Sequence, residues 1–385
     1  MQSVITSDAG RKLNTQKTAR HAGVELLRSI AMLMVITLHY LDKGGVLVSL
    51  TEKQGAPGYL AWLLEAFCIV AVNTYVLVSG YFLTEAGFKL KRLVQLVCQL
   101  LFYSILVPVV LVLAGQLPAS QLTLYDLLNY FLPVQMNHYW FGTAYVLMYL
   151  FVPVLSAGVR NLSKKQLGFT ILTLLLVFSV SKSVLPFQLA IDRQGYDVVW
   201  FLCLFLVAAY LRLYGAGELP GRKGKKQGSG AGFFLYIAGA FGIFLVSLIL
   251  AFLSSRFGKF AYFVESPYQY NHILCLLAAI GLFYGFLNVE LPEGKVAALV
   301  RWLGPYTFGV YLLHENISIR YLWPAWVQAL IPAPGGIWIL QWLAGIFMVF
   351  AAGILMDFLR SRLFAGAEAL FSGKHKGRKN EHKGE

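Results

Sequence analysis

Long apolar stretches alternate with short polar stretches along the whole chain. A helix that crosses the hydrocarbon core of a bilayer needs about 20 mostly apolar residues. Ten stretches satisfy this length to within a few residues: 23–41, 60–82, 93–114, 139–159, 167–186, 197–214, 231–253, 269–288, 302–321 and 336–359. The pattern therefore predicts an all-α fold, a membrane bundle of about ten transmembrane helices.

The stretch 120–136 differs from these ten because it is shorter and interrupted. It contains Asp126, Asn129 and Pro133, and polar groups are costly within the hydrocarbon core. We expect it to lie at the interface or to be re-entrant. No internal repeat is visible, which disfavours a transporter built from repeated halves.

Basic residues are distributed unevenly between the two sides of the predicted bundle. Lysine and arginine total 32, and 24 of them fall in alternate polar stretches and at the chain ends: 1–22, 83–92, 160–166, 211–230, 289–301 and 360–385. Only seven fall on the other side, and Arg28 lies within the first helix. Because cytoplasmic loops carry the excess of basic residues, both termini are predicted to be cytoplasmic.

Composition agrees with a membrane protein and excludes other classes. Hydrophobic residues make up 58% of the chain and charged residues 13%, whereas soluble domains carry about 25% charged residues. The net charge of +14 is not accompanied by a basic helix with interleaved aromatics, so no nucleic-acid partner is expected. The first apolar stretch has no small-residue cleavage site after it and is interpreted as a retained helix.

The polar segments define the predicted organisation. Residues 1–22 form a cytoplasmic segment, 23–360 the membrane domain and 361–385 a cytoplasmic basic tail. The Gly- and Lys-rich stretch 219–230 is predicted to be a flexible cytoplasmic loop, and 373–385 an unstructured, solvated end. Since no loop is long enough for a soluble catalytic domain, any chemistry must occur in or against the helix bundle.

Cysteines give no sign of a metal or disulfide site. The four cysteines lie within apolar runs and form no CxxC pair: Cys68, Cys98, Cys203 and Cys275. This usage favours small packing residues. We predict no metal and no permanently bound cofactor.

Three ionisable residues lie in the first predicted helix, where each is costly at the bilayer centre. They are Glu25, Arg28 and His39. His39 follows Arg28 by eleven positions, which places both side chains on one stripe of the helix, roughly 16 Å apart along its axis. Glu25 is one turn from Arg28 and is a candidate partner. The alternative is an interfacial ion pair with a histidine that reaches the far headgroups.

Further polar and aromatic groups stand at the ends of later helices. The second helix ends with Ser79 and Tyr81 in VSGYF, and the turn after it holds Lys89, Lys91 and Arg92. The alternative to a functional role is packing of small residues for the end of the helix, and orientation in the membrane by charge for the basic turn.

The fourth predicted helix begins with an aromatic cluster, and the ninth carries an unusual acid–base pair. Trp140 and Tyr145 belong to the aromatic cluster of the fourth helix. The alternative to a functional role for them is an aromatic belt at the membrane interface. The ninth contains Tyr311 followed by His314 and Glu315. A His–Glu pair within an apolar run is costly, so it indicates either function or an interhelical hydrogen bond.

Taken together, these segments resemble a known family. The first helix, VELLRSIAMLMVITLHY with ten residues between Arg28 and His39, is similar to the signature of the acyltransferase-3 family of integral membrane acyltransferases. The runs YVLVSGYFL, KLKRL, HYWFGTAYVLMYLFVPVL and YTFGVYLLHE resemble further motifs of that family. The resemblance spans essentially the whole chain.

The resemblance implies transfer of an acyl group, usually acetyl from acetyl-CoA, to a hydroxyl of a carbohydrate or related envelope molecule. The expected partners are then acyl-CoA, an envelope glycan or glycolipid, and the lipids of the cell membrane. A neutral imidazole suits the general base, and anionic coenzyme A phosphates need cations at the cytoplasmic mouth. The candidate site residues are His39, His314 and Glu315 for catalysis; Arg28, Arg92, Lys89, Lys91, Ser79 and Tyr81 for coenzyme A; and Trp140, Tyr145 and Tyr311 for substrate contact or packing.

Two alternatives remain open at this point. A covalent acyl-imidazole relay through His39 would serve the same overall reaction. A transporter or flippase of a lipid-linked glycan or small molecule would use polar residues in the helices to line a substrate path.

Overall fold

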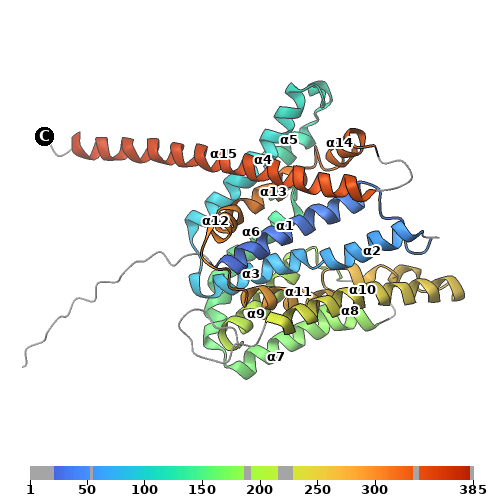
Figure 1. Ribbon diagram of the computed structural model, residues 1–385. Helices are drawn as coiled ribbons and strands as arrows, with labels where there is room; N and C mark the ends of the chain where they lie inside the picture. The colour runs from blue at the N-terminus through green and yellow to red at the C-terminus, as the bar shows by residue number, and fades with distance from the viewer. Residues whose placement is uncertain (1–20, 53–54, 186–191, 216–228, 333–337, 382–385) are drawn as a thin grey trace, which may run out of the picture.

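The computed structural model describes residues 21–52, 55–185, 192–215, 229–332 and 338–381, with the backbone alone from residue 370. Within these ranges the protein consists of helices and turns and contains no strand (Figure 1). The α-helices are α1 Ala22–Lys43, α2 Ala56–Cys68, α3 Ala71–Ala86, α4 Leu90–Leu113, α5 Leu124–Phe131, α6 Trp140–Asn161, α7 Lys164–Leu175, α8 Ser181–Val184, α9 Val198–Tyr214, α10 Ser229–Phe257, α11 Ile273–Leu287, α12 Lys295–Leu303, α13 Thr307–His314, α14 Leu322–Leu330 and α15 Trp338–Glu381.

The helices reproduce the ten predicted spans. Among the described residues, nine helical stretches are long and apolar enough to cross a membrane, and α9 is a shorter apolar helix of 17 residues. Each of these overlaps one of the ten stretches predicted from the sequence. The prediction of an all-α, multi-spanning bundle is therefore confirmed.

Several predicted spans are not continuous α-helices. The second consists of α2 and α3, which meet at a turn at residues 69–70. The fifth changes to a π-helical turn at Leu176–Val180 between α7 and α8. The ninth starts earlier than predicted, as α12, and passes through a 3₁₀ turn, Gly304–Tyr306, into α13.

The ninth span also ends earlier than predicted, at His314 and not at residue 321. Residues 315–321 are mostly in turns, because the side chain of Asn316 forms hydrogen bonds with backbone groups there and in α4. Its Oδ1 accepts from the backbone N–H of Ser318 at 3.0 Å, while its Nδ2 donates to the carbonyl oxygen of Tyr103 at 3.1 Å. Side chains that bond the nearby backbone in this way compete with helix continuation.

The last helix corrects a second prediction. α15 continues to Glu381, whereas the sequence predicts the last span to end near 359 and an unstructured end from 373. The stretch after 360 includes RLFAGAEALF, and Leu, Ala, Arg and Glu favour helix without needing a membrane. The predicted loop 219–230 lies outside the described residues except for its last two, which begin α10.

The short segment before α6 does not span, as predicted. α5 has eight residues and is capped by Thr123, whose hydroxyl accepts from the backbone N–H of Asp126. Its apolar side chains are turned outward: Leu124 is 73% exposed and Phe131 58%. It packs on α4, and its exposed apolar face fits a position at the bilayer interface.

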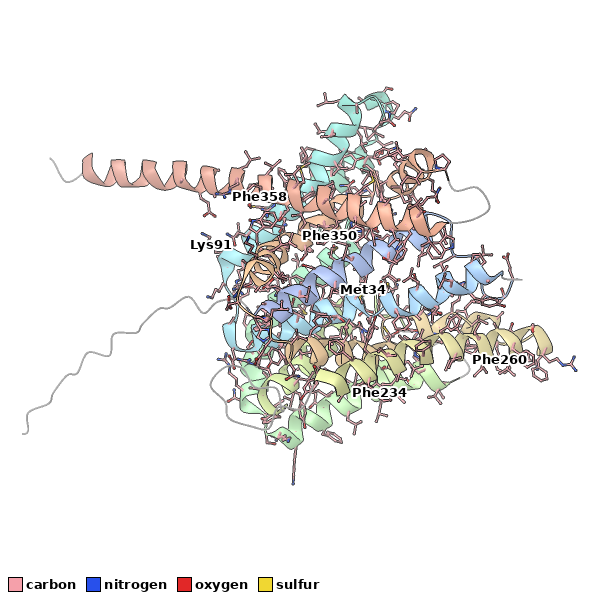
Figure 2. The ribbon with its side chains drawn as sticks, viewed as in Figure 1. Met34, Lys91, Phe234, Phe260, Phe350 and Phe358 are labelled. Atoms are coloured by element: carbon pink, nitrogen blue, oxygen red, sulfur yellow. The ribbon has the colours of Figure 1, made fainter. Side chains whose placement is uncertain are left out.

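α1 forms the centre of the bundle and contacts α2, α3, α11, α12, α13 and α15. Apolar side chains project outward from the peripheral helices; Phe234 of α10, 74% exposed, is one of them (Figure 2). Lys91, in the basic turn after the second span, lies at the opposite end of the bundle from Phe260 (Figure 2). The start of α1 lies at the Lys91 end, so these two segments, which the sequence assigns to the more basic side, share one end of the bundle.

Candidate active site

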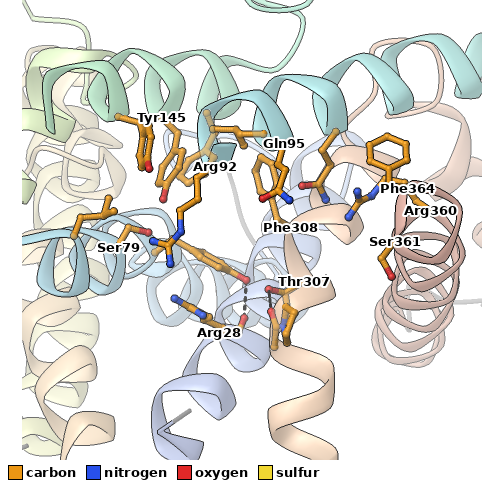
Figure 3. A pocket seen from close by; sticks show the side chains of 18 of the residues that line it. Arg28, Ser79, Arg92, Gln95, Tyr145, Thr307, Phe308, Arg360, Ser361 and Phe364 are labelled. Carbon is orange, nitrogen blue, oxygen red and sulfur yellow. Dashed lines mark hydrogen bonds between the residues drawn. The ribbon is translucent and has the colours of Figure 1, made fainter. Parts of the chain in front are cut away.

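A wide cavity opens at the end of the bundle where the basic turns gather. Its volume is about 550 Å³, and its walls come from α1, α3, α4, α6, α13 and α15. This volume is within the range of roughly 300–1,000 Å³ that small-molecule sites occupy. We call it the mouth cavity (Figure 3).

Three arginines line the mouth cavity. Arg28 of α1 and Arg92 of α4 reach toward each other from opposite walls, and Arg360 comes from α15 (Figure 3). Arg28 donates to Glu25 at 3.0 Å, so the predicted pairing is confirmed, and Arg360 is held by Asp357 at 2.6 and 3.1 Å.

Arg92 differs from the other two because it has no ion-pair partner among the residues that the structure describes. It lies in the first turn of α4, where a basic side chain opposes the helix dipole. That position lowers the stability of the helix. Because the guanidinium has no ion-pair partner in the described part of the chain, it is available to an anionic ligand.

Polar groups from other helices complete the walls of this cavity. Ser79 and Tyr145 line it, as do Gln95 and Thr307. The Tyr75 hydroxyl donates to the carbonyl oxygen of Arg28 at 2.6 Å (Figure 3). This bond fixes the aromatic ring of Tyr75 against α1.

A second, much smaller cavity lies beside His39. Its volume is about 30 Å³, and apart from the imidazole its walls are apolar or aromatic. They include two aromatic residues from the predicted candidates, Trp140 and Tyr311. We call it the inner cavity.

His39 and His314 contact each other, although 275 positions separate them. Nδ1 of His39 lies 2.9 Å from Nε2 of His314, and Nδ1 of His314 lies 2.6 Å from the carbonyl oxygen of Val310. A carbonyl oxygen only accepts, so Nδ1 of His314 carries the hydrogen and Nε2 of the neutral ring is the acceptor. His39 must then donate from Nδ1. Its Nε2 is left with a free lone pair, which is the state a general base requires.

Glu315 adds a negative charge to this pair of imidazoles. Its Oε2 lies 3.3 Å from Nδ1 of His39 and also accepts from Nζ of Lys43, while Arg320 approaches its Oε1 at 3.6 Å. Glu315 is 4% exposed. Two cations compensate the charge of this buried carboxylate, and the carboxylate in turn stabilises an imidazolium when His39 takes up a proton.

Further hydrogen bonds hold the end of α13, which carries His314. The Tyr139 hydroxyl donates to the carbonyl oxygen of Leu312 at 3.0 Å and accepts from Nδ2 of Asn316 at 2.8 Å. Tyr139 is 1% exposed and Asn316 0%. The end of α13, which carries His314, is therefore held in place by buried hydrogen bonds.

The structure gathers most of the predicted site residues and leaves some of them outside. Neither Lys89 nor Lys91 lines either cavity; Lys91 pairs with Glu368 at 3.2 Å on the exposed surface. Tyr81 is buried elsewhere, with the guanidinium of Arg212 4.9 Å from its ring centre. These placements favour the orientation and packing interpretations for the three residues.

Several residues of this region are not predicted from the sequence. Lys43, Arg320, Tyr75 and Arg360 are among them, and each contributes to the cavities or to the Glu315 cluster. In the sequence, Lys43 and Arg320 count only as basic residues of the less basic side. A local pattern gives no signal for the role of Lys43, because its carboxylate partner lies 272 positions away.

Comparison with known proteins identifies a family. A family model described as an acyltransferase domain, acyltransferase 3, matches residues 21–358. Neither the curated proteins nor the solved structures contain a match.

Proposed function

Because this chain belongs to the acyltransferase-3 family, we propose that it is an O-acyltransferase that moves an acyl group, acetyl in the first instance, from acyl-CoA to a hydroxyl of an envelope carbohydrate. Membership of the family makes it a membrane acyltransferase; the donor and acceptor are our proposal. One observation carries it: an arginine-lined cavity leads toward an imidazole whose Nε2 is unprotonated.

The mouth cavity suits coenzyme A. Its three arginines supply charge-assisted bonds for phosphates, and Tyr145, Tyr149 and Phe364 offer aromatic faces. The distribution of basic residues predicts that this end of the bundle faces the cytoplasm, where coenzyme A is made. The pantetheine arm is long and thin and would run from Arg28 toward His39 with the acyl group at its tip.

The proposed reaction is a single transfer at the thioester carbonyl. Nε2 of His39 takes the proton of the acceptor hydroxyl while the hydroxyl oxygen bonds to the carbonyl carbon. The carbon–sulfur bond then breaks, and the imidazolium returns its proton to the leaving sulfur. The products are the ester and free coenzyme A, so atoms and charge balance. His314 and Glu315 act on His39 through Nδ1 and are positioning residues.

The base is tested by replacing His39 with alanine. A general base contributes typically about 10²–10⁴-fold, so His39→Ala should reduce acetylation of surface polysaccharide in cells by at least about 100-fold. The same protein in detergent should keep its thermal stability and its affinity for coenzyme A. Substantial transfer by this variant would refute the assignment, and failure to bind coenzyme A by the wild type would favour a transporter.

The donor site is tested by a matched pair of neighbours. An arginine–phosphate bond is worth about 1.5–3 kcal/mol, so Arg92→Ala should weaken acetyl-CoA binding by about tenfold or more. Lys91→Ala should change it little, because Lys91 points to the surface and pairs with Glu368. Calorimetry on the purified protein measures both. Equal effects of the two substitutions would show that charge near the mouth matters and that the cavity geometry does not.

A further inference from the structure

The mouth cavity and the inner cavity share part of their walls. Tyr75, Phe141 and Phe308 line both. The ring centre of Phe141 lies 6.3 Å from that of Tyr75 and 6.4 Å from that of Phe308. We call these three residues the aromatic collar; an acyl group on its way from the arginines to His39 must pass it.

The inner cavity behind the collar is small. Its volume of about 30 Å³ is a small fraction of the roughly 550 Å³ of the mouth cavity, so it has room for a small group only. An acetyl group has three heavy atoms, whereas a butyryl group has two more carbons. The inner cavity therefore matches the shortest common acyl group.

The inner cavity is also unsuited to an acyl group with a charge of its own. Its walls carry no arginine or lysine among the described residues. Lys43, which shares the carboxylate of Glu315 with His39, is bound to that carboxylate. A carboxylate brought into an apolar wall without a partner is strongly disfavoured, so a succinyl group would be excluded by charge as well as by length.

The collar is held in place by its surroundings. Tyr75 is anchored by its hydrogen bond to the carbonyl oxygen of Arg28. Phe141 is 8% exposed and packs against Phe201, with ring centres 5.3 Å apart, and against Tyr311 at 5.6 Å. A ring packed on several sides does not move aside for a longer chain without a loss of packing.

We propose that the aromatic collar selects the acyl donor by admitting to His39 only acyl groups of about two carbons without charge. The inference rests on the proposed acyl transfer and adds the residues that set its specificity. Longer acyl-CoA molecules still bind, because the mouth cavity has room for them, but they do not deliver their carbonyl to the base.

The test uses inside-out membrane vesicles from cells that produce the full chain together with its natural acceptor. Radiolabelled acetyl-, butyryl- and succinyl-CoA are supplied in turn, and the label incorporated into the vesicle glycans is measured. The variants are Phe141→Ala, Phe308→Ala and the milder Phe141→Leu. The control is Phe234→Ala, on the outer face of α10.

Each methylene that a pocket rejects is worth about tenfold or more in rate. Wild type should therefore incorporate acetyl at least about 100-fold faster than butyryl. The collar variants should raise the butyryl-to-acetyl ratio by about tenfold or more, and Phe234→Ala should leave it unchanged. Succinyl should stay excluded in every variant, because truncation adds space and no cation.

The outcomes separate the two proposals. A wild type that transfers butyryl as readily as acetyl, or collar variants with the wild-type ratio, would overturn the selection while leaving acyl transfer in place. A gain for succinyl equal to that for butyryl would overturn the role of charge. No incorporation from any of the three donors by the wild type would overturn the proposed function itself.

Discussion

Glu315 contacts three partners at once in a place with almost no solvent. It lies against Lys43, Arg320 and His39 while being 4% exposed. A buried ion pair is weak support for stability as long as it is intact, but removing one member leaves a charge without compensation. Replacing one member of the cluster should therefore lower the stability of the fold, whereas replacing both members of an ion pair together should lower it much less.

We expect Lys43→Met to lower the free energy of unfolding by about 3–5 kcal/mol, since Glu315 then loses its closest cation. Glu315→Gln should have a similar effect through Lys43 and Arg320. The double variant should recover most of the loss, because Lys43 and Glu315 then go together. Thermal unfolding in detergent measures all three. Additive losses in the double variant would show that the two side chains act independently.

His138 supplies a second prediction at this scale, on pH. It precedes α6, outside the membrane-spanning helices, and is 3% exposed. Burial lowers its pKa to about 4, against an opposing hydrogen bond from its Nδ1 to the Asn129 carbonyl oxygen at 3.1 Å. Since the ordinary value is 6.5, the unfolded chain binds more protons between these two values. Stability is full above about pH 6.5 and falls as the pH drops toward about 4.

The loss attributable to His138 is on the order of 3 kcal/mol over that window. His138→Asn keeps an N–H for the Asn129 carbonyl and removes the titrating group. Its melting temperature should therefore fall less than that of the wild type when the pH is lowered from about 7 to about 5. Parallel curves for the two proteins would assign the pH dependence to other groups.

Single residues also show where the sequence is sufficient and where it is not. His39 and His314 are recognisable because each is an ionisable group inside an apolar run, and their shared depth follows from the helix directions. The collar is not recognisable, because Tyr75, Phe141 and Phe308 are ordinary aromatic residues in apolar helices. Their joint role depends on three helices meeting, which spacing along the chain does not encode.

At the scale of helices, the close contact of α10 with α11 depends on glycine. A Cβ placed at Gly239 would lie 2.7 Å from the Cβ of Ala278, whereas one at Gly242 would lie 3.6 Å from the nearest atom of Leu274. The first distance is too short for real atoms and the second is ordinary contact. The two helices pack through small residues, as is common between helices in membranes.

This pair of glycines gives a matched test on one helix. Gly239→Ala should destabilise the protein by about 1–3 kcal/mol, because an added methyl overpacks the contact. Gly242→Ala should be neutral or stabilising by up to about 1 kcal/mol, since alanine is the better helix former. Thermal unfolding of the two variants, compared with wild type, measures both effects. A larger loss at position 242 would contradict the packing described.

The length of each apolar stretch predicts where the helices lie, but it does not predict where they are interrupted. All ten predicted spans have a helix, but the breaks at residues 69–70, Leu176–Val180 and after His314 are absent from the prediction. The last of these depends on Asn316 bonding to Tyr103 and Tyr139, which are more than 170 positions away. Partners at that distance are invisible to a local pattern.

At the scale of the whole molecule, orientation in the membrane remains a prediction from the 24 basic residues on one side against seven on the other. A cysteine at Ser229, where α10 begins, should resist a membrane-impermeant thiol reagent in intact cells and react after lysis. A cysteine at Glu52, on the opposite side, should react before lysis. Labelling of Ser229→Cys in intact cells would reverse the assigned orientation, and with it the cytoplasmic position of the mouth cavity.

The narrow passage at the collar has a consequence for the membrane as an insulator. A histidine between two aqueous compartments becomes a leak if a continuous file of water carries protons to it from both sides. The space beside His39 is small, and Phe141 and Phe308 stand between it and the mouth cavity as walls of both. A file of water that is interrupted there would not support Grotthuss-type hopping, so the collar would keep His39 from acting as a proton leak.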